Sequence, residues 1–268
     1  MLETVLIVLV SVAVLVLLLY AIFSRRKKKV NNLDSLPVHY REILKEYVDF
    51  YNDLDEDKKT QFENRLQHFL LTTRIAGVNT DVEDLDRVLI AASAIIPIFG
   101  FAGWEYINLK DVLLYPGSFD EKFNQEGGGR TTLGIVGEGA YQNMMILSKP
   151  ELRQDFINKT AKNNTAIHEF VHLIDKTDGA VDGVPEFLLS KKYILPWLTL
   201  IRDNINEIRH SQSDINPYGA TNEAEFFAVV SEYFFERPDL LQAKHPGLYE
   251  TLIKIFRQEP KKDDQVSI

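Results

Sequence analysis

The chain has 268 residues, of which 45% are hydrophobic and 11% aromatic, so it can bury a sizeable core and is not a disordered protein. Its net charge of -9 is unevenly spread, because residues 1–30 hold five of the 30 bases and only one of the 39 acids. The acidic remainder lacks the basic surface that nucleic-acid binding requires. With no cysteine in the chain, disulfides, thiol catalysis and cysteine-ligated metal sites are excluded.

An apolar run from Thr4 to Phe23 predicts a transmembrane helix. A helix of this length reaches about 30 Å, the thickness of the hydrocarbon core of a bilayer. The alternative is a cleaved signal peptide, which has bases before the run and small residues after it. Here Glu3 precedes the run and five bases follow at 25–29, so the positive-inside rule places the rest of the chain in the cytoplasm. We therefore expect an uncleaved single-pass anchor, with its basic flank, over residues 1–30.

A single domain over 38–258 is expected after a linker at 31–37, with a polar tail at 259–268. Apolar residues at helical spacing predict helices near 38–53 and 56–71. The chain then reads as extended over 72–78, a helix capped by Thr80 or Asp81 runs to about Phe99, and further helices are expected from about 163 and near 189–210, 222–236 and 246–257.

Short β-type runs occupy the middle of the domain, at 111–115, 131–136 and 143–147, with a turn at 127–129. The run at 143–147 is either an edge strand that pairs with a peptide or an ordinary strand inside the sheet. Strands in the middle with helices before and after them predict an α+β domain.

The segment from His168 to His172 predicts the chemistry of the protein. Two histidines four residues apart on a helix project from one face, so they can bind one metal ion. Glu169 lies beside such an ion, where it can take a proton from a metal-activated water and pass it to a leaving amine. Zinc suits this chemistry because it lowers the pKa of the water towards about 7.

The helical wheel places His168, His172 and Asp175 on one face, opposite the apolar residues of the same helix. A solvated polar face is the simpler alternative. Two histidines and a glutamate in this order on the face away from the core favour a metal site instead.

A catalytic zinc usually takes three protein ligands, and without cysteine the third is a histidine or a carboxylate. Glu223 and Glu225, in the first turn of the helix over 222–236, are the richest candidates. Compensation of the helix dipole also explains acids there, and the wheel mildly favours Glu223. The remaining histidines read as surface or helix-end residues: His39, His68, His210 and His245.

Taken together, four stretches resemble the Mlc titration factor A (MtfA) family of zinc peptidases, the glucose-regulated metallopeptidases. They are 111–116 (DVLLYP), 168–175 (HEFVHLID), 216–219 (NPYG) and 223–235 (EAEFFAVVSEYFF). The resemblance covers roughly residues 38–258. It implies a zincin-like, gluzincin-type domain with a mainly helical surround and a small sheet. It also implies zinc ligation by His168, His172 and a downstream glutamate, which alignment of the Ala-Glu-x-Phe-Ala pattern makes Glu225.

The same resemblance implies a tyrosine near the third ligand, at Tyr218. Its phenol can stabilise the oxyanion of a tetrahedral intermediate, although a turn aromatic after Pro217 is the alternative. Asp175 either orients a histidine ligand or is a helix-end carboxylate.

The sequence thus predicts a membrane-anchored zinc peptidase that faces the cytoplasm and acts on peptides or proteins, with Glu169 as general base. The alternative is a membrane-tethered protein that sequesters a transcriptional regulator, with zinc structural or vestigial. A non-peptidic amide hydrolase with the same centre is a third hypothesis. The best-known family members are soluble and bind a repressor of glucose-related genes, so that partner is not transferred to an anchored chain by default.

Overall fold

The computed structural model describes residues 36–119, 132–137, 143–186 and 188–260. The chain divides into two units, Met1–Leu36 and Pro37–Ile268, and the fold described here is that of the second unit. The expected transmembrane run, its basic flank and the turn at 127–129 lie outside the described residues. Within the described part, no helix is both long and apolar enough to cross a membrane.

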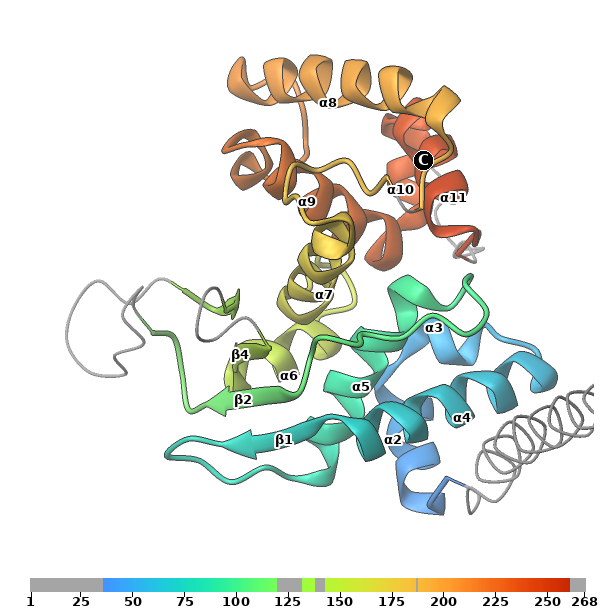
Figure 1. Ribbon diagram of the computed structural model, residues 1–268, viewed down its shortest axis with the longest axis vertical. Helices are drawn as coiled ribbons and strands as arrows, with labels where there is room; N and C mark the ends of the chain where they lie inside the picture. Colours follow the sequence, from blue (N-terminus) through green and yellow to red (C-terminus); the bar gives the residue numbers. More distant parts are fainter. Residues whose placement is uncertain (1–35, 120–131, 138–142, 187, 261–268) are drawn as a thin grey trace, which may run out of the picture. The chain divides into compact units, whose positions relative to one another are not determined.

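A four-stranded mixed sheet forms one side of the domain, in the order β1-β2-β4-β3 (Figure 1). The strands β1 (Arg74–Gly77), β2 (Asp111–Tyr115) and β4 (Met144–Ser148) run parallel, and β3 (Gly134–Val136) pairs with β4 in the antiparallel sense. The predicted run at 143–147 is therefore an interior strand, since β4 lies between β2 and β3. Among the strands of the described ranges, β3 is at the edge of the sheet on this side.

The first helices are α2 (Val38–Tyr47), α3 (Asp49–Asn52) and α4 (Glu56–Thr72). The single helix expected over 38–53 is wrong, because Val48 adopts an extended conformation and divides it. The helix α4 has the expected bounds to within one residue, and the side chain of Asp55 caps it by accepting from the backbone N–H of Lys58.

The helix α5 (Asp84–Ile98) begins later than predicted, since neither Thr80 nor Asp81 caps it. Glu83 is the N-cap, in a reciprocal capping box with Asp86. Arg153 binds both carboxylates, at 2.8 Å from Glu83 and 2.7 Å from Asp86. A partner 67 residues away in sequence thus helps to fix where this helix starts.

The second half of the domain is helical, and two of its helices were not predicted: α6 (Lys149–Ile157) and α10 (Pro238–Lys244). Both have a proline in the first turn, which is a recognised helix-start signal. The other helices confirm the predicted positions, with shifted ends: α7 (Thr165–Asp175), α8 (Ile194–Arg209), α9 (Glu223–Glu236) and α11 (Pro246–Phe256).

The helix α7 lies between α5 and α9 and contacts both (Figure 1). Behind α9, the rings of Phe227, Phe234 and Phe256 are stacked at centroid distances of 5.8–5.9 Å, and all three are fully buried. Aromatic packing of this kind holds α9 and α11 together and gives α9 a rigid base.

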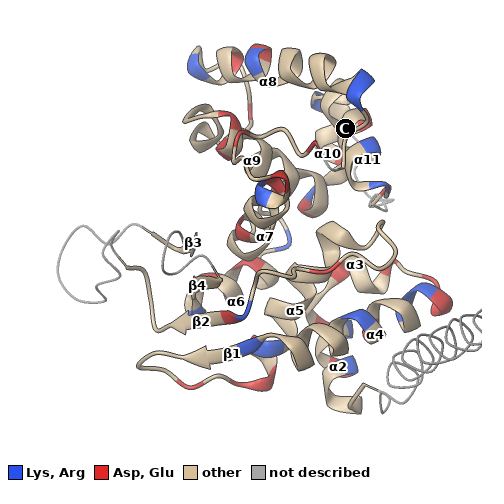
Figure 2. Ribbon diagram, viewed as in Figure 1, with Lys and Arg blue, Asp and Glu red and all other residues tan. Residues whose placement is uncertain are grey.

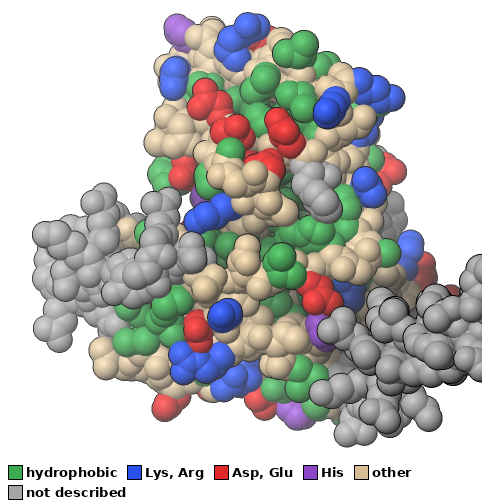
Figure 3. Space-filling view, in the orientation of Figure 1, with side chains coloured by type: hydrophobic (Ala, Val, Ile, Leu, Met, Phe, Trp, Pro, Cys, Tyr) green, Lys and Arg blue, Asp and Glu red, His purple; other side chains and the backbone are tan. Residues whose placement is uncertain are grey.

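Charged residues are mixed along the helices, with Lys and Arg next to Asp and Glu on the same elements (Figure 2). On the face shown in Figure 3, several acidic side chains lie close together over the region of α8 and α9. On this face, the described residues therefore form a mixed-charge surface with a local excess of acids.

Candidate metal centre

The helix α7 is fixed at its start by Asn164, whose side-chain oxygen accepts from the backbone N–H of Ile167 at 3.0 Å. Its apolar face is buried, as predicted. Its polar face is largely buried too, with His168 9% and Asp175 1% exposed and His172 half-buried. The solvated-face alternative is therefore wrong, because α9 packs over this side of α7.

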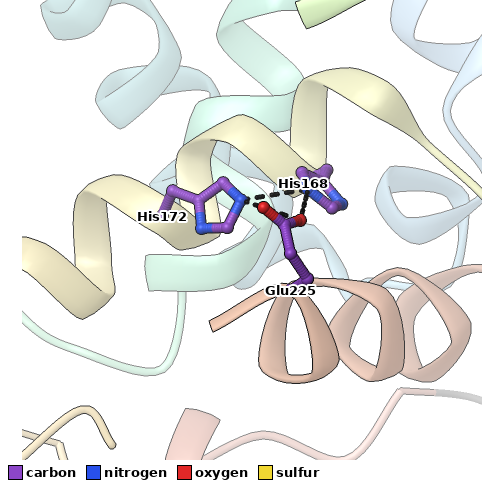
Figure 4. Close-up of side chains that lie close together, drawn as sticks. All are labelled: His168, His172 and Glu225. Atoms are coloured by element: carbon purple, nitrogen blue, oxygen red, sulfur yellow. Dashed lines mark hydrogen bonds and ion pairs between the residues drawn. The ribbon is translucent and has the colours of Figure 1, made fainter. Parts of the chain in front are cut away.

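Three side chains from the two helices converge at one point (Figure 4). His168 Nε2 lies 3.0 Å from Glu225 Oε2 and 3.0 Å from His172 Nε2, and His172 Nε2 lies 3.5 Å from the same glutamate oxygen. One ligand atom from each residue lies within 4.8 Å of the others, so the group can hold a metal ion.

The structure brings Glu225 to this point, whereas Glu223 is exposed to solvent. The mild preference of the helical wheel for Glu223 is therefore wrong. The wheel ranked both acids by their distance from the apolar stripe of α9. The helix α7 instead contacts α9 at the flank of that stripe, where Glu225 lies. The four other histidines contact different groups: His39 contacts Asp84, His68 contacts Glu105, His210 contacts the carbonyl of Asn206, and His245 contacts Asp214.

The donor set fits a divalent cation. Burial alone would lower the pKa of His168, but the carboxylates of Glu232, Glu225 and Glu169 raise it well above its usual value. Burial would raise the pKa of Glu225, yet hydrogen bonds from the two histidines lower it to about 2. The carboxylates thus give the surroundings of the two facing imidazole nitrogens a net negative charge. A cation bound between the imidazole nitrogens and the Glu225 oxygen would neutralise that charge.

Glu169 lies against strand β3. A side-chain carbon added at Gly134 would lie 2.8 Å from Glu169 Cγ and 2.9 Å from its Oε1. Only glycine permits this approach of the strand. Burial raises the pKa of Glu169, and the nearby His168 and His172 oppose that rise.

Tyr218 lies in the short 3₁₀ turn Pro217–Ala220, and its ring centroid is 6.0 Å from that of His168. It is 53% exposed, so the phenol stands beside the centre and remains open to solvent. Burial of part of the ring and the charges of Glu225 and Glu169 raise its pKa, which keeps the phenol protonated at neutral pH. The structure therefore brings Tyr218 next to a candidate ligand, and its part in the chemistry stays a prediction.

The segment before this turn is held by Asp214. Its carboxylate accepts from His245 Nε2 at 2.7 Å, from the hydroxyl of Tyr233 at 2.9 Å and from Lys244 at 3.0 Å, and Lys162 pairs with it too. These contacts lower the pKa of Asp214 despite its partial burial. They anchor the turn that carries Tyr218 to α9, α10 and the loop before α7.

Asp175 is 1% exposed, and its Oδ2 accepts from the backbone N–H of Gly183 at 2.8 Å. Asp175 Oδ1 and His172 Nδ1 are both buried, and neither has a hydrogen-bond partner among the described residues. The carboxylate is therefore more than a helix-end group, since it fixes the loop after α7. The geometry shows no hydrogen bond between it and His172.

The sequence profile of the family described as "Glucose-regulated metallo-peptidase M90" matches residues 22–257. The chain belongs to this family.

Known relatives are similar to the chain over most of their length. The chain is 30% identical over 236 residues to the uncharacterized protein slr2042 of Synechocystis sp., which covers 84% of this chain and 86% of that protein. It is 27% identical over 222 residues to Mlc titration factor A of Escherichia fergusonii, covering 78% and 82%. It is 28% identical over 215 residues to Mlc titration factor A of Salmonella paratyphi B, covering 75% and 79%.

The principal residue that sequence reasoning missed in this M90 chain is Glu232. Its Oε1 lies 2.6 Å from His168 Nδ1, and its Oε2 accepts from the backbone N–H of Asn164 at 2.7 Å. An imidazole held at Nδ1 by a carboxylate presents Nε2 to the centre in a fixed orientation. The available signal was the spacing of seven residues between Glu225 and Glu232, which puts both on one face of α9.

Besides Glu232, a buried carboxylate of α6 also binds the backbone at the start of α7. Asp155 is 3% exposed, and its Oδ2 accepts from the backbone N–H of Thr165 at 2.7 Å while its Oδ1 accepts from Asn163 at 3.2 Å. Burial raises its pKa to about 7, against the lowering effect of the Thr165 hydrogen bond.

We predict that Asp155→Asn becomes more stable relative to wild type as pH rises from about 4 to 8. The carboxyl is protonated in the folded state up to about pH 7 but ionises in the unfolded state near its ordinary pKa of about 4, so ionisation opposes folding as pH rises through this window. The variant lacks this penalty. The expected gain in the free energy of unfolding at pH 8 is about 1–3 kcal/mol, measured by urea titration across the pH range.

Glu42→Gln, at an exposed carboxylate of α2, is the control and should follow the wild-type curve. A difference between Asp155→Asn and wild type that does not change with pH would contradict the burial effect.

Proposed function

We propose that this protein is a zinc-dependent peptidase of the gluzincin type, which hydrolyses peptide bonds in peptide or protein substrates. One observation carries the proposal: the convergence of His168, His172 and Glu225 on one point, with Glu169 on the same helix as the histidines. Membership of the M90 family supports it. A site that only stabilised the fold would have no need of a buried carboxylate beside the donors.

Zinc is the metal that this donor set favours. Two imidazole nitrogens and one carboxylate oxygen form a three-ligand set that leaves a fourth position for water or substrate. When bound, zinc supplies Lewis acidity, which lowers the pKa of an attacking water and polarises the scissile carbonyl.

Glu169 is the proposed general base and acid. Its carboxylate is buried beside the donors, and the raised pKa makes it a stronger base for the proton of the attacking water. It would take a proton from the attacking water and give it to the leaving nitrogen. Tyr218, protonated at neutral pH, would donate a hydrogen bond to the oxyanion that develops on the carbonyl.

The substrate path is proposed to follow β3. This strand is at the edge of the sheet and contacts Glu169 through Gly134, so a peptide that adds to it as a further strand would lie beside the general base. The short distance between Gly134 and Glu169 would set how far the backbone of such a peptide lies from the Glu169 carboxylate.

For the N-terminus, we propose an uncleaved anchor that leaves the catalytic domain in the cytoplasm. The apolar run from Thr4 to Phe23 and the five bases after it support this topology. A peptidase held at the membrane would act on substrates at its cytoplasmic face.

A second candidate is a binding protein that sequesters a transcriptional regulator. The name of the relatives, Mlc titration factor A, favours it, because that name describes titration of a partner. In that function the metal would be structural, and Glu169 would have no chemical part.

We predict that Glu169→Gln keeps zinc and thermal stability but lowers peptide hydrolysis by about 10²–10⁴-fold, the usual share of general acid–base catalysis. Glutamine preserves the shape of the side chain and removes the basic oxygen. Zinc content, melting temperature and cleavage of a peptide library are measured on the full-length protein in detergent, with Glu223→Gln, an exposed acid on α9, as the control.

A Glu169→Gln variant that holds zinc and cleaves at the wild-type rate would contradict the role of Glu169 as general base. The binding function is supported instead if zinc-loaded wild type cleaves nothing in the library, and a transcriptional regulator binds wild type and variant equally.

We predict that Glu225→Ala loses tightly bound zinc, whereas Glu223→Ala retains one zinc per chain. Among the described residues, only Glu225 places a carboxylate oxygen within 3.5 Å of both histidine nitrogens. Metal analysis after dialysis distinguishes the two variants. Loss of zinc from Glu223→Ala with retention in Glu225→Ala would show that the third ligand has been assigned to the wrong acid.

We predict that a tag at the C-terminus is protected from protease added to intact cells and that the mature protein keeps residues 1–23. The charge asymmetry around the apolar run is the reason. Protease protection and N-terminal sequencing check both points. A tag digested from outside, or a mature chain that starts after Phe23, would rule out the proposed topology.

A further inference from the structure

The loop between α7 and α8 passes the first turn of α9, and Gly183 is the point of closest approach. Its φ of +74° lies in the left-handed region, where glycine is favoured. A Cβ built there would lie 2.2 Å from the carbonyl oxygen of Glu223 and 3.1 Å from the backbone nitrogen of Ala224. Any other residue would therefore have to displace the backbone at the start of α9.

Both backbone polar groups of Gly183 are also bound. Its N–H donates to Asp175 Oδ2 at 2.8 Å, and its carbonyl accepts from the indole N–H of Trp197 at 2.7 Å. Asp175 is the last residue of α7 and Trp197 is a fully buried residue of α8. One residue without a side chain thus contacts the end of α7, the core side of α8 and the first turn of α9.

These contacts lie close to the candidate ligands on both helices. Asp175 is three residues after His172, about one turn away, and Glu223 and Ala224 immediately precede Glu225. The ligands come from two separate helices, so the distance between the histidines and the glutamate depends on how closely the start of α9 approaches the end of α7. Gly183 fills that space with the smallest possible group.

We propose that Gly183 is a positioning residue for the metal centre, which sets the separation of α7 from the first turn of α9 and so places Glu225 against His168 and His172. The inference rests on the proposed function, because it concerns the same three ligands. Gly183 touches no ligand directly and acts through the backbone of Glu223 and Ala224.

The test is the zinc affinity of the full-length protein in detergent, measured by competition with a chelator. Gly183→Ala should lower the affinity by about 10–100-fold, the usual effect of changing groups that orient metal ligands. Gly103→Ala is the matched control, since Gly103 has the same φ of +74° and no described atom within 4 Å of its added Cβ. Its affinity should stay within about threefold of wild type, because backbone strain without displacement leaves α9 in place.

A double-mutant cycle with Glu225→Ala identifies the route of the effect. If Gly183 acts by placing Glu225, Gly183→Ala should lower zinc affinity by less than about threefold once Glu225 is absent. Equal losses in both backgrounds, or wild-type affinity in Gly183→Ala, would overturn the inference. A wild-type protein that binds no zinc would instead overturn the proposed function.

Circular dichroism of the metal-free variants checks that they are folded. If Gly183→Ala does not fold, the cycle is run with Trp197→Phe, which removes the donor to the Gly183 carbonyl without adding an atom at the helix contact. Its zinc affinity should fall several-fold in the presence of Glu225 and not in its absence, and unchanged affinity would overturn the inference.

Discussion

The contact between α7 and α9 is the constraint on which the rest of the site depends. Asn164 lies at its centre: the side chain caps α7, the backbone N–H binds Glu232, and the side-chain amide donates to Glu236 at 2.9 Å. Glu232 in turn holds the ring of His168. A buried polar group without a partner is costly, so the register in which these groups of Asn164, Glu232 and Glu236 are all paired is favoured. That register brings Glu225 to the two histidines.

The same contact concentrates negative charge in a place shielded from water. Glu169 and Glu232 are each 6% exposed, and the carboxylate of Glu225 lies against His168. Without a cation, the cost of burying these carboxylates is reduced by proton uptake on His168, whose pKa is raised accordingly. A bound divalent cation would replace that proton. A metal that binds the folded chain and not the unfolded chain would then stabilise the fold by mass action.

Features that depend on local spacing could be predicted from the sequence. The pair His168 and His172 and the strand Asp111–Tyr115 both follow from neighbours within a few positions. Glu225 was favoured over Glu223 by family resemblance, and the helical wheel alone pointed the other way. Glu232 and Gly134 were missed because their partners are distant in the chain and the contacts exist only after packing. The predicted start of α5 was wrong for the same reason, since Arg153 binds the capping residue from another helix.

The order of the ligands along the chain has a consequence for synthesis. Glu225 follows His168 by 57 residues, and Glu232 follows it by 64. A nascent chain therefore exposes both histidines to the cell while the third ligand and the carboxylate that orients His168 are still in the ribosome. Two imidazoles on an isolated helix of eleven residues form a weak, short-lived chelate, since such a helix is marginal in water. The three candidate ligands can therefore come together only after α9 has emerged, so the proposed hydrolytic activity would begin only when nearly all of the domain has been translated.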